Sequence, residues 1–400
     1  MIGNSAKNII VSYKPEVTFN LAVSGGGATQ FRANPGPGMD LKRARVQSNE
    51  FRKDGMKSMF RLGSREVAGG PYETDLVVGA IDALVASIFR NTFTVSLALV
   101  AADFTTITTT AHSIVFAANS PITKGIRIGD VLVLSAMPDA ANNKNVRVTG
   151  LSATTITVAE TLIVNAVGSA APTITRPKKV VNSLGAPFTL SSYTVEEYYE
   201  DFDDSKIFSG CRVSMLKFAW GPDAMVKVSV GFVGADMTIP GGASAPTFTS
   251  PTYPLGIGLT AQDAVLRFNG ADVAVLTSGE ITIDLGGKGI PVIGAVVTPD
   301  IYLNAFDVKG QFTGVRTSMA NEAAFTAETE FDAQMLCVDN VAEPKNFVNL
   351  YLPRLKYTGA GAPFGADGPV IETLPWEAAA KEVTSGYDSP NMIVFQTSAP

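Results

Sequence analysis

The sequence is poor in the residues that most catalytic and metal sites require. It contains a single histidine, His112, and two cysteines, Cys211 and Cys337, which stand far apart in the chain. A structural zinc site needs about four nitrogen or sulfur ligands, and a nucleophilic cysteine or serine needs a base beside it. Both cysteines lie in strand-like segments, where a buried free thiol is the expected state. We therefore expect no metal centre, no disulfide framework and no catalytic histidine.

Membrane-spanning segments and phosphate-binding loops are also missing. No apolar run approaches the roughly 18 residues that a membrane-spanning helix needs. The glycine-rich stretch at 286–289 lacks the Ser or Thr and the helix that complete a phosphate loop, and so predicts a turn. Glu328 and Glu330 share one face of a predicted strand, but we expect these carboxylates to be solvated rather than a glycosidase pair. The sequence thus predicts no enzyme, no cofactor and no membrane contact.

Charged residues make up only 17% of the chain and are unevenly placed. Residues 1–70 carry eleven Lys or Arg against five Asp or Glu, so the rest of a chain whose net charge is −6 carries −12. The stretch 42–65 predicts a basic extended arm or long loop, and an acidic cluster follows at 196–204. The cations of interest are Arg43, Arg45, Arg52, Lys53 and Arg61, and the carboxylates are Glu200, Asp201, Asp203 and Asp204. Basic arms are typical of nucleic-acid binding, but an acidic body repels phosphate, and a solvated charged face is an equally good interpretation.

One long amphipathic helix is predicted, from about Thr74 to Arg90. Thr74 is a candidate N-cap because its hydroxyl can accept from a first-turn amide, and Asp75 suits the positive end of the helix dipole. Apolar residues recur with a period of 3.6 and form one stripe. The stripe consists of Val77, Ile81, Leu84, Val85 and Ile88. We expect it to pack against a sheet.

The remaining sequence is dominated by strand signals. Runs with period-two alternation, separated by Gly, Pro and Asn turns, predict a mainly β protein. Residues 92–177 are nearly uncharged until Lys124 and contain several short strand-like runs, so we expect a small inserted all-β domain of about the minimum size that folds alone. The body then comprises residues 1–91 and 178–400.

The order of these elements resembles that of the tail tube proteins of long-tailed bacteriophages. The resemblance rests on VAGGPYETDLVVGAIDALVASIFR after a strand and a basic loop, on IFSGCRVSMLKFAW followed by VKVSVGFVGAD, and on the late FTGV and NLYLPRLKY stretches. It covers most of the chain outside residues 92–177, which look like the additional β domains that decorate tail proteins.

This resemblance implies both a fold and a function. The implied fold is a β-sandwich or barrel-like core with one packed helix, whose strands join those of neighbours into a closed ring, usually a hexamer. Rings would be assembled in the host cytoplasm and would stack into a tube of the virion tail, through which DNA passes without specific binding. The implied partners are other copies of the chain and the tape measure, tail terminator and distal tail proteins. On this basis we hypothesise that the arm cations meet the acidic cluster of an adjacent subunit or ring.

Two other classes of protein stay open at this point. A head decoration or baseplate protein could have the same β-rich style, and rings or tubes with a central hole would distinguish a tail tube subunit from both. An enzyme or a carbohydrate-binding surface protein would instead hold a ligand in a concave pocket with convergent polar residues.

Overall fold

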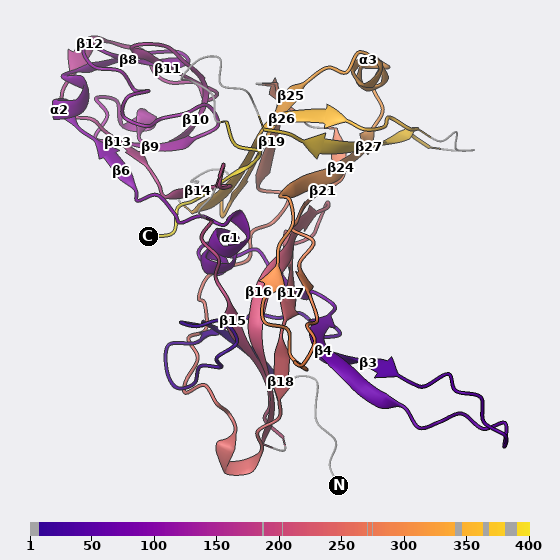
Figure 1. Ribbon diagram of the computed structural model, residues 1–400. Helices are drawn as coiled ribbons and strands as arrows, with labels where there is room; N and C mark the ends of the chain where they lie inside the picture. The colour runs from indigo at the N-terminus through magenta and orange to yellow at the C-terminus, as the bar shows by residue number, and fades with distance from the viewer. Residues whose placement is uncertain are drawn as a thin grey trace.

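The computed structural model describes residues 8–185, 188–201, 203–269, 271–273, 275–340, 346–362, 368–380 and 390–400. Its strands form sheets of 18, 8 and 2 strands, and the prediction of a mainly β protein is confirmed. Figure 1 shows a lower region, an upper region at the right, a lobe at the upper left and an arm that projects from the lower region. In the described part of the chain, no helix is long and apolar enough to cross a bilayer.

The longest strand, β16 (Asp204–Trp220), connects the lower and upper regions. It pairs with β15 (Tyr193–Tyr199) and β17 (Lys227–Gly234), and its later half also pairs with β21 (Leu276–Asp284). Residues 207–214 are buried without interruption. The centre of β16 is therefore covered on both faces, although it includes the polar residues Ser209, Arg212 and Ser214.

The other strands extend the sheet on both sides of β16. In the lower region they are β1 (Ile9–Pro15), β2 (Thr29–Gln30), β3 (Met39–Val46), β4 (Arg61–Gly69), β5 (Tyr72–Asp75) and β18 (Asp236–Thr238). Towards the upper region they are β14 (Lys179–Val181), β19 (Ala264–Phe268), β20 (Ala271–Asp272), β24 (Asp307–Val315), β25 (Phe331–Val338), β26 (Phe347–Tyr357), β27 (Ile371–Ala378) and β28 (Val394–Thr397). The small separate pair is β22 (Lys288–Gly289) and β23 (Ile301–Tyr302).

The lobe at the upper left of Figure 1 is formed by the segment that we expected as an insertion. Its strands lie in the order β12-β7-β8-β11-β10-β9-β13-β6. Buried apolar residues of this segment, among them Phe104, Phe116 and Ile156, form a cluster separate from the main core. The strands are β6 (Leu97–Leu99), β7 (Ile107–Thr110), β8 (Ser113–Phe116), β9 (Val131–Ser135), β10 (Asn145–Leu151), β11 (Thr155–Val158), β12 (Asn165–Ser169) and β13 (Thr173–Arg176).

The predicted helix over 74–90 is wrong in its first half. Helix α1 comprises only Asp82–Phe89. Thr74 caps nothing, because it lies in β5, which pairs with β17. The chain turns between the two elements, and Gly79 there has a φ of +80°, which a right-handed helix does not contain. The apolar stripe is therefore shared between a turn and a short helix.

Helix α1 lies in the middle of the molecule, where it packs against β16 and β14 (Figure 1). The Phe89 ring meets the Phe306 ring edge to face at 5.9 Å, and Asp82 pairs with Lys178 at 3.1 Å. Two shorter helices, α2 (Ala101–Phe104) and α3 (Ala320–Thr326), were not predicted. The stripe residues are each at most 2% exposed: Val77, Ile81, Leu84, Val85 and Ile88. The stripe thus belongs to the core of the subunit.

The lobe is held against the body at three consecutive residues, 129–131. The Gly129 carbonyl accepts hydrogen bonds from the side-chain amides of Gln334 and Asn349, both at 3.0 Å. Gly129 has a φ of +87°, and a β-carbon on it would overlap the Tyr351 ring. Glycine is therefore required at this close approach.

The next two residues and one arginine complete the joint. Asp130 and Lys179 form a buried ion pair, and the Gln396 side chain bonds both the N–H and the carbonyl of Val131, at 2.8 and 2.9 Å. Arg147 of the lobe also pairs with a carboxylate of the β20 segment at 3.0 Å. Because these polar groups are satisfied across the joint and largely shielded from water, the lobe has one preferred orientation on the body.

Candidate assembly interface

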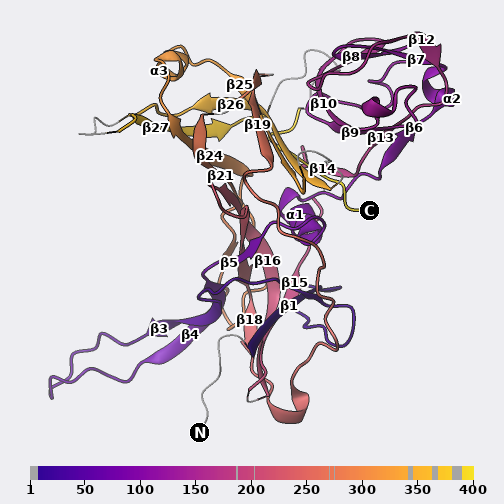
Figure 2. The ribbon, with the colours of Figure 1, turned by 180° about the vertical axis from the view of Figure 1, so that it is seen from behind.

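The basic stretch forms a projecting two-stranded hairpin. β3 and β4 pair antiparallel, from Met39 opposite Gly69 to Val46 opposite Arg61. Figures 1 and 2 show the hairpin leaving the lower region and extending well away from it. We call residues 39–69 the arm. Its extended form was predicted, whereas its strand pairing was not.

The base of the arm is fixed by a buried carboxylate. Glu197 accepts from the backbone N–H of Met39 at 3.1 Å and from the Tyr72 hydroxyl at 2.6 Å. Burial, reinforced by the nearby Glu197 charge, raises the pKa of Tyr72 well above its ordinary value, so its hydroxyl stays a donor. Arg65 of β4 also pairs with Asp236 at 2.7 Å. The arm therefore leaves the body in a defined direction.

Three of the five arm cations named from the sequence are engaged within the arm. Arg43 donates to backbone carbonyls of β4 at 3.2–3.4 Å. The Arg45 guanidinium lies over the Phe60 ring, 4.7 Å from its centroid, and Arg52 pairs with Asp54 at 2.7 Å. These contacts stiffen the arm and leave less of its charge for a partner.

Other cations of the arm remain available. Within the described residues, they form no hydrogen bond or ion pair, and they are exposed. They are Lys42, Lys53, Lys57 and Arg61. Lys53 and Arg61 are therefore the two sequence-predicted interface cations that are free to meet another chain.

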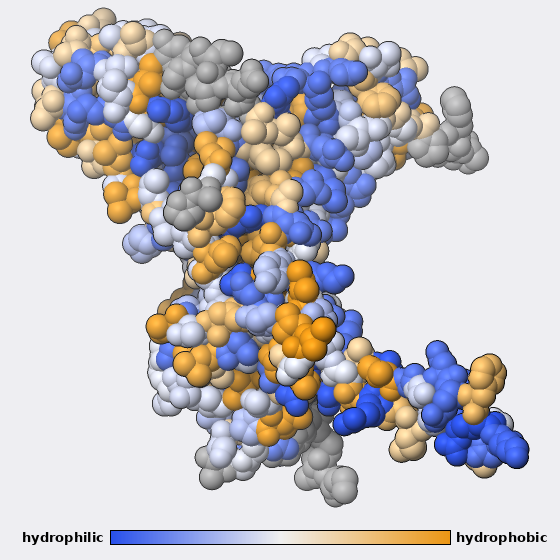
Figure 3. Space-filling view, in the orientation of Figure 1, coloured by the Kyte–Doolittle hydropathy of each residue, from blue (hydrophilic) through white to orange (hydrophobic). Residues whose placement is uncertain are grey.

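The arm also displays large apolar side chains, which the sequence offers as possible anchors of the basic stretch. Single exposed apolar residues are ordinary, but a group of them on one projecting hairpin marks an interaction surface. Figure 3 shows hydrophobic and hydrophilic residues intermixed along the arm. These side chains are between 47% and 107% exposed: Val46, Phe51, Met56, Met59, Phe60 and Leu62.

The four acidic residues named from the sequence gather where β15 turns into β16. They are Glu200, Asp201, Asp203 and Asp204. Asp203 accepts from the Tyr198 hydroxyl at 2.8 Å. The base of the arm lies beside this turn, since Asp40 pairs with Lys206 at 3.1 Å. In the part of the chain that the structure describes, no ion pair joins the four carboxylates to the cations of their own arm.

Two further members of the acidic cluster are internal. Glu196 is buried and accepts from the backbone N–H groups of Thr247 and Phe248 at 2.7 and 3.0 Å, and Glu197 holds the arm base as described above. Sequence alone could not separate these two from the other four, of which Asp204 is half-buried and the rest are exposed, because the strand β15 buries both of its faces at this point.

Groups suited to catalysis or metal binding do not converge anywhere in the described ranges. No three His, Cys, Asp or Glu residues there lie close enough to hold a metal ion. Both cysteines are buried and free, and burial raises the pKa of Cys337 to about 12. Such thiols are inert at neutral pH.

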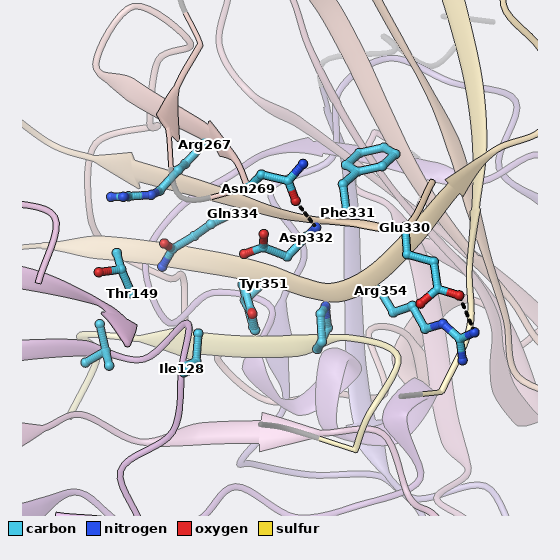
Figure 4. Close-up of a pocket in the computed structure, with 12 residues that line it drawn as sticks. Ile128, Thr149, Arg267, Asn269, Glu330, Phe331, Asp332, Gln334, Tyr351 and Arg354 are labelled. Atoms are coloured by element: carbon cyan, nitrogen blue, oxygen red, sulfur yellow. Dashed lines mark hydrogen bonds and ion pairs between the residues drawn. The ribbon is translucent and has the colours of Figure 1, made fainter. Parts of the chain in front are cut away.

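The best-defined pocket has a volume of about 350 Å³ and lies between the lobe and the body (Figure 4). Two interactions join residues of its lining: the Arg354 and Glu330 side chains are paired, and the Asn269 side-chain oxygen accepts from the backbone N–H of Asp332. Neither histidine nor cysteine is among the described residues that line it.

The described fold is a mainly β body that carries a projecting hairpin with exposed charged and apolar side chains. Residues 6–378 match the family described as phage tail tube protein. The chain therefore belongs to the phage tail tube protein family, and it is a structural protein of the virion tail. The resemblance found in the sequence is confirmed, and the matched span includes the lobe. Among curated proteins, none matches the chain.

Proposed function

We propose that copies of this chain associate into closed rings and that the rings stack into a tube through the arm. The observation that carries this proposal is the arm itself, which combines unpaired cations with exposed apolar side chains. Closing a sheet across subunits removes the open strand edges that otherwise invite uncontrolled pairing. Head-to-tail contacts between rings then extend the structure along one axis.

The tube is the conduit for DNA ejection. The ring is a hexamer, and the tape measure, tail terminator and distal tail proteins are its further partners, as is usual for this type of tail. A net charge of −6 supports a lumen that DNA passes without sticking, because like charges disfavour close contact with phosphate. The chain acts as a non-enzymatic component that needs no cofactor.

The inserted segment forms a domain of its own in this proposal. Residues 92–177 constitute it, and residues 1–91 and 178–400 constitute the discontinuous body. The separate apolar cluster and separate sheet of the lobe support this division. The polar joint at residues 129–131 then fixes the domain on the tube instead of leaving it on a flexible tether.

The arm cations, in this proposal, meet Glu200, Asp201, Asp203 and Asp204 of an adjacent subunit or ring. The test is a triple charge reversal at the unpaired positions Lys53→Glu, Lys57→Glu and Arg61→Glu. Each of these side chains is exposed, so the subunit should fold with an unchanged melting temperature, while tubes visible by negative-stain electron microscopy should be lost. Raised salt should weaken assembly of the unmodified protein for the same reason.

A control reverses two lysines outside the arm, Lys227→Glu and Lys356→Glu, whose ammonium groups lie 3.5–3.6 Å from carboxylates of the same subunit. Lys227 is 51% and Lys356 is 40% exposed at the side chain. This control changes the net charge in the same direction and should still form tubes. Normal tubes from the arm variant, or equal loss in the control, would contradict a specific role of the arm charges.

A further inference from the structure

Two long segments without any charge lie side by side in the lower region. Residues 17–31 and 237–262 contain no Asp, Glu, Lys or Arg. Parallel bridges join them, one between Gly25 and Phe248. We call these segments the uncharged loop pair. Charged side chains from outside the two segments do lie against them: Lys14 donates to the Ser24 and Gly26 carbonyls, and Arg32 donates to the Gly256 carbonyl.

The uncharged loop pair displays large apolar side chains to solvent. Their exposed fractions lie between 64% and 96%. The side chains are Val17, Leu21, Ile239, Leu255 and Ile257. Exposed apolar side chains that gather on one uncharged surface are the mark of a protein contact.

The loop at the start of this surface is held rigidly. The Glu16 carboxylate accepts four hydrogen bonds of 2.7–3.0 Å, from the N–H groups of Asn20 and Gly210 and from the hydroxyls of Ser192 and Thr194. The apolar side chains that follow Glu16 are thus presented in a fixed geometry. A surface organised in advance loses less conformational entropy when a partner binds.

A second uncharged surface lies elsewhere in the lower region. Residues 289–299 contain no charge, and Ile290, Val292, Ile293 and Val296 are 44–107% exposed. The Val296 carbonyl accepts from the N–H of an arm-base residue of β4 at 2.8 Å, so this loop runs beside β4. In Figure 3 a hydrophobic patch lies just above the point where the arm leaves the body.

Loop 17–31 and loop 289–299 lie at opposite ends of one strand order. β2 pairs with β1, β1 with β15, β15 with β16, β16 with β17, and β17 with β4. Residues 17–31 and the bridged residues 248–252 adjoin the β2 end, and loop 289–299 adjoins the β4 end, whereas Leu259 at the far end of the loop pair bonds with Leu76 and Val226, next to β5 and β17. In Figure 1 the corresponding loops flank the lower region on its two sides. Distinct surfaces at opposite ends are what a head-to-tail ring contact uses.

We infer that the uncharged loop pair of one subunit docks on loop 289–299 of the next copy in the ring. The inference rests on the proposed ring and names its side-to-side contact. Copies that each carry −6 repel one another, so they approach at least cost through segments that contain no carboxylate of their own. The contact is apolar, in contrast to the charged contact of the arm, and so it should persist at high salt.

A cysteine pair tests the contact directly. Leu21→Cys and Ile293→Cys are introduced together, and the two native cysteines are buried and do not compete. Oxidation of assembled protein should give a ladder of linked subunits on a non-reducing gel, ending at the ring number. Each single variant should give no ladder. Absence of a ladder from the double variant in assembled tubes overturns the inference.

Glutamate variants provide a second measurement. Leu21→Glu and Ile293→Glu should each abolish rings as well as tubes, with the subunit still folded by circular dichroism. The control is Val167→Glu, the same kind of change at a valine that is 76% exposed on β12 of the lobe, and it should assemble normally. Unmodified protein that forms no rings or tubes would refute the proposed function and this inference with it. Unmodified protein that assembles alongside an assembling Leu21→Glu variant would refute the inference alone.

Discussion

At the scale of one residue, Leu84 offers a test of whether the apolar stripe packs inside the subunit or against another subunit. Its side chain is fully buried in α1. Leu84→Asp removes a buried apolar group and leaves an unpaired charge, which should cost on the order of 5 kcal/mol and prevent folding. Ala83→Asp, at the exposed neighbour, is the control and should fold. Thermal melts of soluble protein measure both. A Leu84→Asp variant that folds and fails only to assemble would show that the stripe contacts another subunit.

Asp82, at the start of the same helix, should make stability depend on pH. Burial raises the pKa of Asp82, and the Lys178 ammonium offsets part of that effect. A carboxyl whose pKa is higher in the folded state binds more protons when folded, so its contribution is fully present below the unfolded pKa of about 3.9. This contribution to the free energy of unfolding is lost as the pH rises through the pKa that Asp82 has in the folded state.

Asp82→Asn should therefore flatten the stability profile in that window. Melting temperatures of the unmodified protein and the variant, measured from pH 3.5 to pH 7, give the comparison. As the pH rises, the melting temperature of Asp82→Asn should increase relative to that of the unmodified protein. A difference that is constant across the range would mean that Asp82 titrates alike in the folded and unfolded chains.

At the scale of elements, α1 shows what sequence periodicity could and could not predict. The apolar stripe and its burial could be predicted, because apolar residues that recur every 3.6 positions lie on one face of a helix. The helix start was not, because tertiary pairing of Tyr72–Asp75 with β17 overrides the local helix signal. Gly79 was the available clue, since glycine inside a helical pattern lowers the case for a helix.

The arm gives a similar lesson. Its position and charge were evident from the sequence, but its strands carry cations and small residues rather than the β-branched runs that identify strands. The pairing of β3 with β4 is determined at the base, where buried Glu197 and the ladder with β17 fix the two chains. Partners this distant in sequence leave no local signal. The uncharged loop pair likewise becomes one surface only through a long-range bridge.

The joint between lobe and body can be tested at Gly129. Gly129→Ala places a methyl group into the Tyr351 ring at a positive φ, and should cost roughly 2–3 kcal/mol. Because the lobe has its own apolar cluster, the substitution should weaken the contact between lobe and body without unfolding the lobe. Hydrogen exchange of residues around the joint, with a thermal melt, measures the effect. Gly185→Ala, with open space around the new methyl group, is the control. Unchanged exchange in Gly129→Ala would contradict a close, fixed joint.

The whole molecule combines contact regions that differ in their chemistry. The arm offers charge and exposed apolar groups, the lower region offers two neutral apolar surfaces, and the lobe is attached by buried polar contacts. Net charge per copy opposes association, so assembly must come from these local surfaces rather than from overall attraction.

Negative-stain electron microscopy of the purified, unmodified chain tests the central claim most directly. If the arm stacks rings of this protein, concentrated samples should contain hollow tubes of uniform diameter, together with end-on rings that have a central hole. Protein that remains a folded monomer at all concentrations, or that forms only solid aggregates without a lumen, would contradict the account.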